Sequence, residues 1–501
     1  MKRITGALTA CILWCAAAFL SAQQYQIRDV FYAIDGMTWE YSLRTNIRID
    51  TDTVFADRAA FDAYIADITQ QFQNLRILER SSVTWTEGPA GEDGVIPAAL
   101  FIAVKDTVNM IALPYPKYNS NDGFELKIKY KDYSFLGAME EFNADVLYEY
   151  NEDSEHVVGL GADFIIPFPI GIVESEWLNS YRFDFNITRK EPEFALSTGF
   201  LFSLPFDRVS LNLTVKQGFY RDLDYEEYGD TMYGQEYAEF AVPVTLAEIQ
   251  NWGDIDWTPY ISGTFNWDKD GINKENDDLY GPRLAVGHSI SSSRVNWYGN
   301  FREGASLSLG QSFTYNFSEA ELKPAVTLSA TGFKAFKYVG LAGRFTGIVR
   351  INHTDTMGSY LRGVLDDEDV DKALDNNGGI ILNLDVPIKL FQTDWCGWGA
   401  ALFKREMPDW LHYLDFEMQL SPFIDFALTY TYDTKTEIVT PRTWYTAGFE
   451  VLVFPLKFRS IMVRASLGFD LGRTLFKNVI DQSWRADVSI YELSIGVGLF
   501  Y

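Results

Sequence analysis

Hydrophobic and polar residues alternate with a period of two from Gly123 to the end of this chain. Successive side chains of a β-strand point to opposite faces, so this pattern predicts strands with one apolar face. Counting such runs gives about sixteen strands, five of them after an acidic loop. Roughly 380 residues of strand and turn, with no helices to cover a sheet, favour one closed antiparallel transmembrane β-barrel over a soluble sandwich.

The first residues have the pattern of a targeting segment. Lys2 and Arg3 precede an apolar run that ends at Leu20, and Ser21-Ala22 is a suitable cleavage site. A membrane-spanning helix needs about 20 apolar residues, which favours a cleaved signal peptide at 1–22 over an anchor. A lipoprotein alternative through Cys11 leaves too short an apolar run before the cysteine. No later segment has the length of a spanning helix without charge, so entry into a membrane requires a closed barrel.

Composition excludes several classes of function. The formal net charge of -27 disfavours nucleic-acid binding, which requires Lys and Arg to neutralise phosphates. After signal removal only Cys396 remains, so neither an intrachain disulfide nor a thiolate metal cluster is expected. Aromatic residues make up 16% of the chain, which suits the interfacial girdles of outer-membrane barrels. The chain has no serine elbow, zinc-protease motif or phosphate-binding loop, and its four histidines are scattered. We therefore predict no catalytic site, no metal site and no cofactor.

Residues 25–115 differ from the rest of the chain and predict a small α+β domain. Their expected elements follow the order β-α-α-β-β: an extended run at Tyr25–Ile34, helices at Trp39–Ile47 and from Asp57 onward, and strands at Leu78–Thr86 and Val95–Val104. Pro114 and Pro116 are interpreted as a stiff linker to a barrel that covers 120–501. A generic α+β domain remains an alternative for this region.

Side-chain parity predicts a charge cluster inside the barrel. The apolar alternation of Ile380–Ile388 and Leu414–Tyr430 turns Asp385, Phe423 and Asp425 inward. Arg362 and Gly363 lie in the preceding loop, at about 354–377, and a loop folded inward would bring the guanidinium to these acids. Unpaired charges inside the barrel would cost several kcal/mol, which favours a paired cluster. The alternative is a surface turn at Arg362-Gly363, with the acids facing water in the lumen.

The last strand, Glu492–Tyr501, is predicted to be weakly held in the barrel wall. Tyr491, Leu493, Ile495, Val497, Leu499 and Tyr501 share its apolar face. Gly496 and Gly498 lie on the other face and weaken it, as glycine does within strands. A weakly held closing strand suits a lateral gate, in which the first and last strands separate. A bend near the barrel rim explains the glycines equally well.

Several motifs together resemble a known family. They are Ser359-Tyr-Leu-Arg-Gly-Val364, Phe423-Ile-Asp425, Tyr133-Ser-Phe-Leu-Gly137 and the aromatic end at Tyr501. The chain resembles the outer-membrane protein assembly and translocation barrels, the bacterial surface antigen family, whose members include BamA, TamA and FhaC. Its N-terminal part resembles one POTRA module, whereas family members usually carry more. That departure leaves the subfamily and its client open.

The resemblance implies both a function and a mechanism. Arg362, at the tip of an inward-folded loop, is expected to contact Asp385 and the Phe423-x-Asp425 motif. The protein would assist the insertion or translocation of other polypeptides, without enzymatic activity. Its partners would be unfolded outer-membrane or secreted polypeptides, outer-membrane lipid and periplasmic accessory proteins, around a monomeric barrel in the outer membrane with a periplasmic N-terminal domain. The alternative is a passive porin-like or surface-exposed structural outer-membrane protein without assembly activity.

Overall fold

The computed structural model describes residues 23–92, 94–119, 123–150, 154–221, 232–249, 252–268, 281–355, 360–364, 376–433, 438–476 and 490–500. The predicted signal peptide, Tyr501 and most of the loop at 354–377 lie outside these residues. The chain divides into two compact units, Met1–Thr107 and Val108–Tyr501. No helix in the described part of the chain is long and apolar enough to cross a membrane.

The N-terminal unit is a four-stranded sheet with two helices. Its elements are β1 (Gln24–Asp35), α2 (Glu40–Asn46), β2 (Val54–Phe55), α3 (Arg58–Asn74), β3 (Leu78–Glu87) and β4 (Val95–Asp106). The sheet order is β2-β1-β4-β3, with β1 parallel to β4 and β3 antiparallel to it, so β3 is an edge strand. The predicted order β-α-α-β-β is therefore confirmed, and the two-residue β2 is added to it.

Helix α3 shows why this unit folds as it does. The Asp57 carboxylate accepts a hydrogen bond of 2.8 Å from the Ala60 backbone N–H and caps the helix start. Phe61, Ile65, Ile68 and Phe72 recur at helical spacing and are all buried. This apolar stripe anchors the helix on the sheet.

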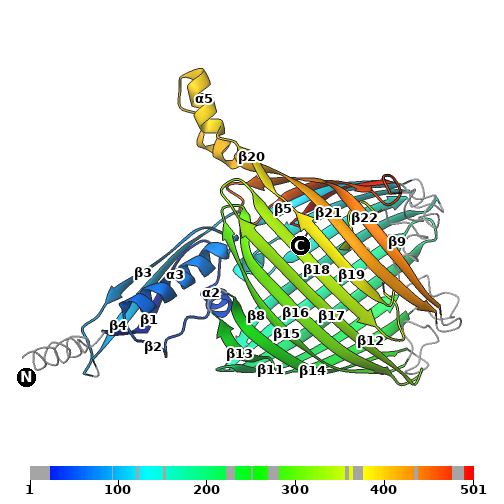
Figure 1. Ribbon diagram of the computed structural model, residues 1–501, viewed down its shortest axis with the longest axis horizontal. Helices are drawn as coiled ribbons and strands as arrows, with labels where there is room; N and C mark the ends of the chain where they lie inside the picture. Colours follow the sequence, from blue (N-terminus) through cyan, green and yellow to red (C-terminus); the bar gives the residue numbers. More distant parts are fainter. Residues whose placement is uncertain are drawn as a thin grey trace, which may run out of the picture. The chain divides into compact units, whose positions relative to one another are not determined.

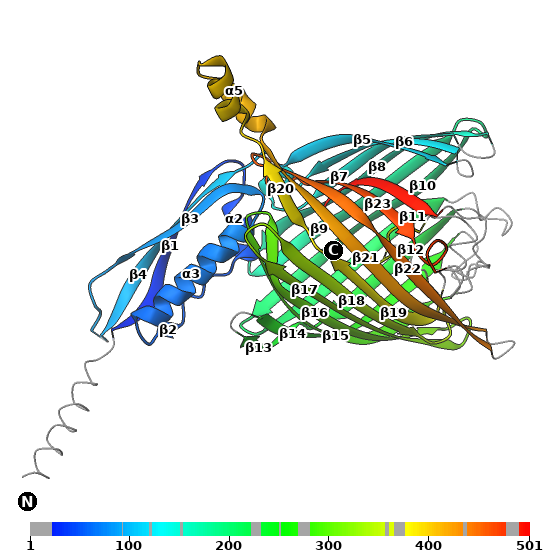
Figure 2. The same ribbon diagram turned by 45° about the horizontal axis from the view of Figure 1, so that its top comes forward.

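The C-terminal unit is a closed antiparallel barrel (Figures 1 and 2). Before the Arg-Gly loop its strands are β5 (Met110–Asn119), β6 (Gly123–Asp132), β7 (Phe142–Tyr150), β8 (His156–Ile170), β9 (Val173–Asn186), β10 (Glu191–Phe206), β11 (Val209–Arg221), β12 (Met232–Ala241), β13 (Val244–Ile249), β14 (Gly253–Trp267), β15 (Arg283–Tyr298), β16 (Phe301–Asn316), β17 (Glu321–Ala335) and β18 (Gly340–Arg350). After it come β19 (Gly378–Asp385), β20 (Ile388–Gln392), β21 (Phe416–Asp433), β22 (Ile438–Pro455), β23 (Val463–Asp470) and β24 (Tyr491–Val497). The last strand, β24, closes the ring against β5.

The described residues form twenty strand segments in this ring. Segments β12 and β13 share the neighbours β11 and β14, while β19 and β20 both pair with β21. Counting each interrupted pair once leaves eighteen barrel strands. As predicted, five of these follow the loop. The total is two more than the predicted sixteen or so, and the excess lies before the loop.

One of the additional strands corrects the predicted linker. Pro114 and Pro116 lie within β5, which pairs with β6 from Met110↔Asp132 to Asn119↔Gly123. Two prolines two residues apart remove N–H donors from the same edge of a strand, so the opposite edge can still pair. The boundary between the units is accordingly at 107/108, not near 115.

The barrel wall has the two faces of a transmembrane β-barrel. Its outward residues are apolar and exposed along all parts of the ring, among them Leu160, Phe183, Leu196, Leu213, Val286, Leu307, Leu384 and Ile424. The alternate residues point into the lumen and are largely polar. Every backbone group in a closed barrel can find a partner in a neighbouring strand, which is the condition for a strand to cross lipid.

The antiparallel order assigns the connections to the two ends of the barrel. Successive barrel strands run in opposite directions, so the start of β5 and the turn between β20 and β21 lie at the same end. The loop between β18 and β19, which contains Arg362, leaves from the opposite end. The turn after β20 contains the helix α5 (Trp395–Phe403) and the 3-10 helix η4 (Asp409–Leu414), and it projects from the rim (Figure 1).

Candidate functional site

Residues Tyr360–Val364 form the described tip of the Arg-Gly loop, and they lie against the inner wall of the barrel. Leu361 and Val364 are buried in an apolar cluster with Ile348, Ile381, Ala427 and Trp444, which come from β18, β19, β21 and β22. Burying a side chain of this size contributes about 1.5–3 kcal/mol. These two contacts hold the loop tip on the wall on either side of Arg362.

Arg362 makes a fork of hydrogen bonds to two carboxylates. Its Nη1 donates to Asp385 Oδ1 at 2.7 Å, and its Nη2 donates to Asp425 Oδ1 at 2.7 Å. Nε and the backbone N–H of Arg362 both donate to Asp425 Oδ2, at 3.0 and 3.1 Å. The Arg362 and Asp425 side chains are 5% and 0% exposed. Such a pair withstands burial because charge-assisted, bidentate hydrogen bonds replace the lost water.

A third acid and two aromatic rings complete the surroundings of the guanidinium. Glu450 Oε1 on β22 lies 3.3 Å from Arg362 Nη1. The Arg362 Cζ atom is 3.8 Å from the centroid of the Phe423 ring and 4.2 Å from that of Phe500. Aromatic rings stabilise a desolvated cation through their electron-rich faces. Arg344 and Arg464 also lie over the Phe500 ring, at 4.9 and 5.6 Å, so three arginines share it.

Gly363 brings the loop backbone into contact with the last two strands. Its N–H donates to Glu492 Oε2 on β24 at 2.7 Å. Its φ of +80° lies in the left-handed region that favours glycine. A Cβ atom added at Gly468 on β23 would be 2.5 Å from Gly363 Cα, so this approach of two backbones requires glycine.

Arg362 and Gly363 therefore contact every barrel strand that follows the loop. Asp385 belongs to β19, Asp425 to β21, Glu450 to β22, Gly468 to β23 and Glu492 to β24. Five consecutive strands, up to the one that closes the ring, thus share one attachment point. We call Arg362, Asp385, Asp425 and Glu450 the loop-tip cluster.

The structure brings together the five residues predicted for this cluster: Arg362, Gly363, Asp385, Phe423 and Asp425. The predicted parity is also seen. The inward residues of β19 and β21 are buried, including Asn383, Asp385, Glu417, Gln419, Ser421, Phe423, Asp425 and Thr429. The loop tip contacts Asn383, Asp385, Phe423 and Asp425. Toward the other end of β21, Glu417 pairs with Lys389 and Gln419 bonds to Asn300.

The predicted closing strand needs a correction at its end. Strand β24 stops at Val497, not at the chain terminus, and Tyr501 lies outside the described residues. Gly498 has a φ of +94° and allows the chain to turn inward. Leu499, which was predicted on the apolar outer face, instead packs on Leu452, Phe454 and Met462. Gly496 remains in the strand, opposite Arg464.

Four contact residues were missed by the sequence prediction: Glu450, Gly468, Glu492 and Phe500. A signal existed for Glu450, because Phe449 and Val451 flank it as apolar outward residues. Glu492 and Gly468 also have inward parity, but parity does not show which inward residues a loop reaches. No sequence pattern marked Phe500 as a contact of Arg362. The alternation of apolar and polar residues continues beyond Val497, where strand β24 ends.

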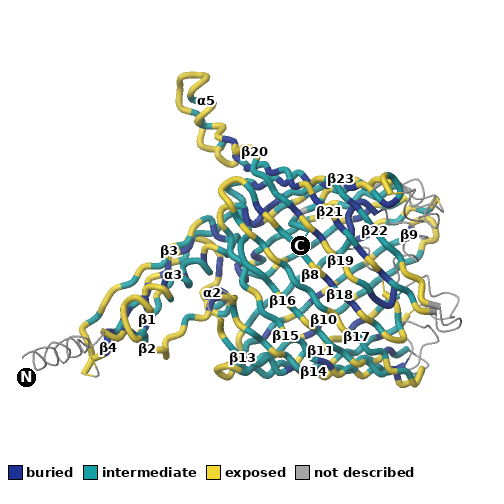
Figure 3. Tube along the Cα trace, viewed as in Figure 1, coloured by how far each residue is buried: buried dark blue, intermediate teal, exposed yellow. Residues whose placement is uncertain are grey.

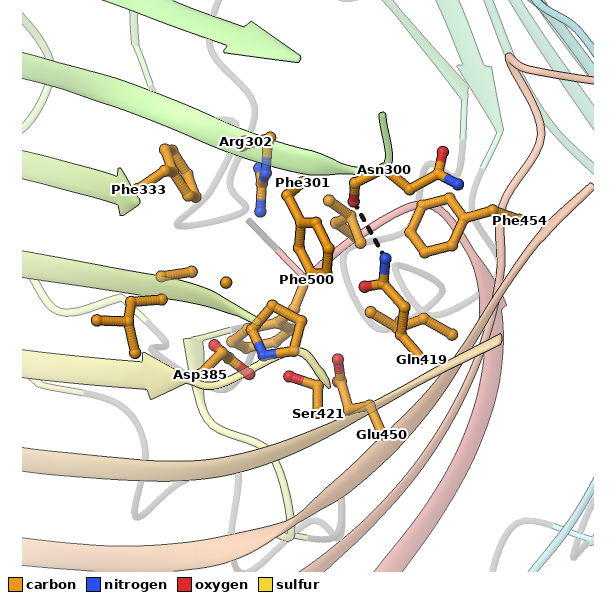
Figure 4. Close-up of a pocket in the computed structure, with 16 residues that line it drawn as sticks. Asn300, Phe301, Arg302, Phe333, Asp385, Gln419, Ser421, Glu450, Phe454 and Phe500 are labelled. Atoms are coloured by element: carbon orange, nitrogen blue, oxygen red, sulfur yellow. Dashed lines mark hydrogen bonds between the residues drawn. The ribbon is translucent and has the colours of Figure 1, made fainter. Parts of the chain in front are cut away.

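A cavity of about 40 Å³ adjoins this cluster in the lumen. It separates Phe500, Asp385 and Glu450 from Asn300, Phe301 and Arg302 (Figure 4). Gln419 crosses this space and donates to the Asn300 carbonyl at 3.3 Å.

One group of side chains away from this cluster could hold a metal ion. Ligand atoms of Asp394, His412 and Asp415 lie within 4.8 Å of one another at the base of α5. Their carboxylates already accept hydrogen bonds from the backbone: Asp394 from Gly397 and Asp415 from Trp395, each at 2.8 Å. These contacts account for the acids as helix-capping groups, and we assign no metal to them.

The known proteins to which this chain is similar share its fold, and their sequences differ widely from it. No family model and no curated protein matches the sequence. Similar solved structures include CdiB from Acinetobacter baumannii, with a TM-score of 0.46 and 10% identity over 95% of this chain and 74% of that one. BamA from Haemophilus ducreyi lacking POTRA domains 1–3 has a TM-score of 0.38 and 10% identity over 95% and 85%. CdiB from Escherichia coli has a TM-score of 0.41 and 8% identity over 95% and 90%.

BamA is a member of the family that the sequence motifs resemble, and that resemblance rests on the motifs themselves. TM-scores below 0.5 at 8–10% identity carry no argument about what this chain does.

Proposed function

We propose that this protein is an outer-membrane barrel that assists the insertion or translocation of other polypeptides. The observation that carries the proposal is the attachment of one loop tip to all five strands on one side of the closure. A passive pore needs no such attachment. A barrel that opens between β24 and β5 needs an element that holds the closing strands together while they move.

The chain end supports a link between the loop tip and the closure. Gly363 binds Glu492 on β24, and Phe500, three residues after that strand, stacks on Arg362. Moving β24 away from β5 would therefore disturb contacts of Arg362. We propose that the loop-tip cluster holds β19–β24 as one body, that Gly496 weakens the closing strand, and that Gly498 turns the chain end toward the cluster.

The N-terminal unit would receive the client. Strand β3 is an edge strand of ten residues, and an extended polypeptide can add to such an edge through backbone hydrogen bonds. We propose that this unit is a POTRA-like periplasmic domain that follows a cleaved signal peptide. The clients would be unfolded outer-membrane or secreted polypeptides. The barrel would act as a monomer, with periplasmic accessory proteins and without enzymatic activity.

Depletion in the native bacterium tests the proposal. The abundance of other outer-membrane barrels and of secreted proteins would be measured after depletion and after complementation with wild type, Arg362→Ala or Arg182→Ala. Arg182 is the matched control, because it is also an inward arginine paired with two aspartates, but it lies on β9, on the β5 side of the closure and not among β19–β24. We expect wild type and Arg182→Ala to restore client abundance, and Arg362→Ala to fail at equal expression.

A porin-like protein would give the opposite results. Depletion would leave the other barrels unchanged, and the purified wild type would form a steady, solute-permeable pore in planar bilayers. Complementation by Arg362→Ala at wild-type level would also exclude the proposed role of the loop-tip cluster.

A further inference from the structure

The turn between β20 and β21 forms a helical hairpin, residues 395–414, that is rich in large apolar side chains. Helix α5 contains no charged residue and no buried residue. Leu402 is 75% exposed and Phe403 63%. The hairpin also exposes Trp395 and Trp398 on α5 and Trp410, Tyr413 and Leu414 on η4. A soluble turn at a barrel rim would not expose so many large apolar side chains together.

The hairpin is attached to the wall by specific hydrogen bonds. Trp395 N–H donates to Asp415 Oδ1 at 2.8 Å, and the Trp395 indole Nε1 donates to the Leu414 carbonyl at 3.0 Å. Asp394 caps α5 through the Gly397 N–H at 2.8 Å. Asp415 is buried at the foot of β21, and its carbonyl accepts from the Leu456 N–H after β22 at 2.8 Å. The base of the hairpin is therefore part of the barrel wall.

The apolar surface of the hairpin continues that of the barrel exterior. Leu390 and Phe391 on β20 are exposed directly before it. Both ribbon views show α5 projecting outward from the rim beyond the wall (Figures 1 and 2), and most of its residues are exposed (Figure 3). At about 1.5 Å per residue, nine residues span roughly 14 Å, too little to cross a bilayer but enough to lie at its boundary.

We propose that this hairpin lies in the phospholipid leaflet at the end of the barrel where the chain enters β5. Tryptophan and tyrosine favour the boundary between headgroups and acyl chains, where the ring is apolar and its N–H or O–H remains hydrated. Lys404 and Arg405 directly follow the apolar helix, so their charged ends can reach the headgroups. Trp398, Leu402 and Phe403 enter the acyl region as an interfacial anchor. The inference rests on the proposed membrane location, but not on the proposed assembly activity.

Depth-dependent fluorescence quenching tests this placement. In a Cys396→Ser background, Leu402→Cys is labelled with the dye NBD and the full chain is reconstituted in phosphatidylethanolamine/phosphatidylglycerol vesicles. Arg208→Cys is the matched control, an exposed residue in the β10–β11 turn at the same end of the barrel. Heat-dependent gel mobility verifies that each variant is folded. We expect lipids that carry a nitroxide near the headgroup to quench the probe at 402 more strongly than the probe at 208, and iodide to quench only the probe at 208.

Equal quenching of both probes by iodide would place the hairpin in water and overturn the proposal. Protection of residue 402 from both quenchers would show that it does not lie at the headgroup boundary, which also overturns the proposal. The measurement uses purified protein without client, so its failure leaves the assembly function standing. Failure of Arg362→Ala complementation likewise leaves the hairpin unaffected.

Discussion

Two arginine–carboxylate clusters inside the same barrel differ in how they are built. The loop-tip cluster places Arg362 between acids of three strands, and its side chains are 0–10% exposed. The wall cluster consists of Arg182 and Asp184 on β9 and Asp145 on β7, bridged at 2.7 and 2.8 Å. These side chains are 29%, 19% and 24% exposed. The nitrogen–oxygen distances in the two clusters are alike, but the side chains of the loop-tip cluster are more deeply buried.

The difference shows what a second layer adds to a barrel wall. The wall cluster is made by β7 and β9, with Gly159 and Gly161 of β8 leaving room between them. The loop-tip cluster is covered from the lumen side by the loop and by Phe500. Water screens an exposed ion pair, whereas a buried pair depends on its partners for all solvation. Arginine–carboxylate pairs therefore contribute differently to the free energy of unfolding in the loop-tip cluster and in the wall cluster.

Removing the two arginines gives the largest expected contrast. Arg362→Ala leaves Asp385 and Asp425 buried without their main cation and should lower the free energy of unfolding by about 3–5 kcal/mol. Arg182→Ala should cost less than about 1 kcal/mol, because water reaches its aspartates. Urea unfolding of the reconstituted barrel, followed by tryptophan fluorescence, measures both. Equal losses would show that the covering layer does not matter.

Adding one methyl group beside each cluster gives an intermediate contrast. At Gly468 the new Cβ would meet backbone atoms of Gly363 at 2.5 and 2.6 Å, which cannot yield without lifting the loop tip. At Gly159 the nearest atoms would be the side-chain ends of Asp184 and Arg182, which can rotate away. We expect Gly468→Ala to cost about 1–3 kcal/mol, as overpacking does.

The Gly159→Ala change should be close to neutral, since alanine also regains roughly 0.5–1 kcal/mol of strand propensity. The same urea titration reports both variants, and a double-mutant cycle with Arg362→Ala locates the effect. If Gly468→Ala costs as much in the Arg362→Ala background as in wild type, the methyl group does not act through the loop tip.

Replacing the ring at the chain end gives the smallest expected change. Phe500→Leu keeps apolar volume but removes the ring that Arg362, Arg344 and Arg464 share. Cation–π contacts of this kind contribute about 0.5–2 kcal/mol. We expect a loss in that range, together with more frequent openings in planar-bilayer recordings. Wild-type stability and conductance in this variant would mean that the chain end does not contribute to the loop-tip cluster.

Much of the fold was predictable because side-chain parity is a local property. The alternation in 380–388 and 414–430 correctly turned Asp385 and Asp425 inward, and the helical spacing of Phe61, Ile65 and Ile68 correctly identified α3. The prediction failed at two places where proline or glycine occurs in an unusual structural setting. Prolines in β5 were interpreted as a linker, and the alternation through Gly498 concealed an inward turn.

By itself, the sequence determined which side of each strand meets lipid and which meets the lumen, because the backbone of a strand alternates whatever its neighbours are. It did not determine which lumen residues are buried. Around Arg362, burial depended on the loop tip, which contacts β19 and β21–β24 from the inside, and on Phe500, which covers the guanidinium. Contacts such as Gly363 with Gly468, or Arg362 with Phe500, join residues more than a hundred positions apart. Only the closed ring brings them together, so only the tertiary structure could show them.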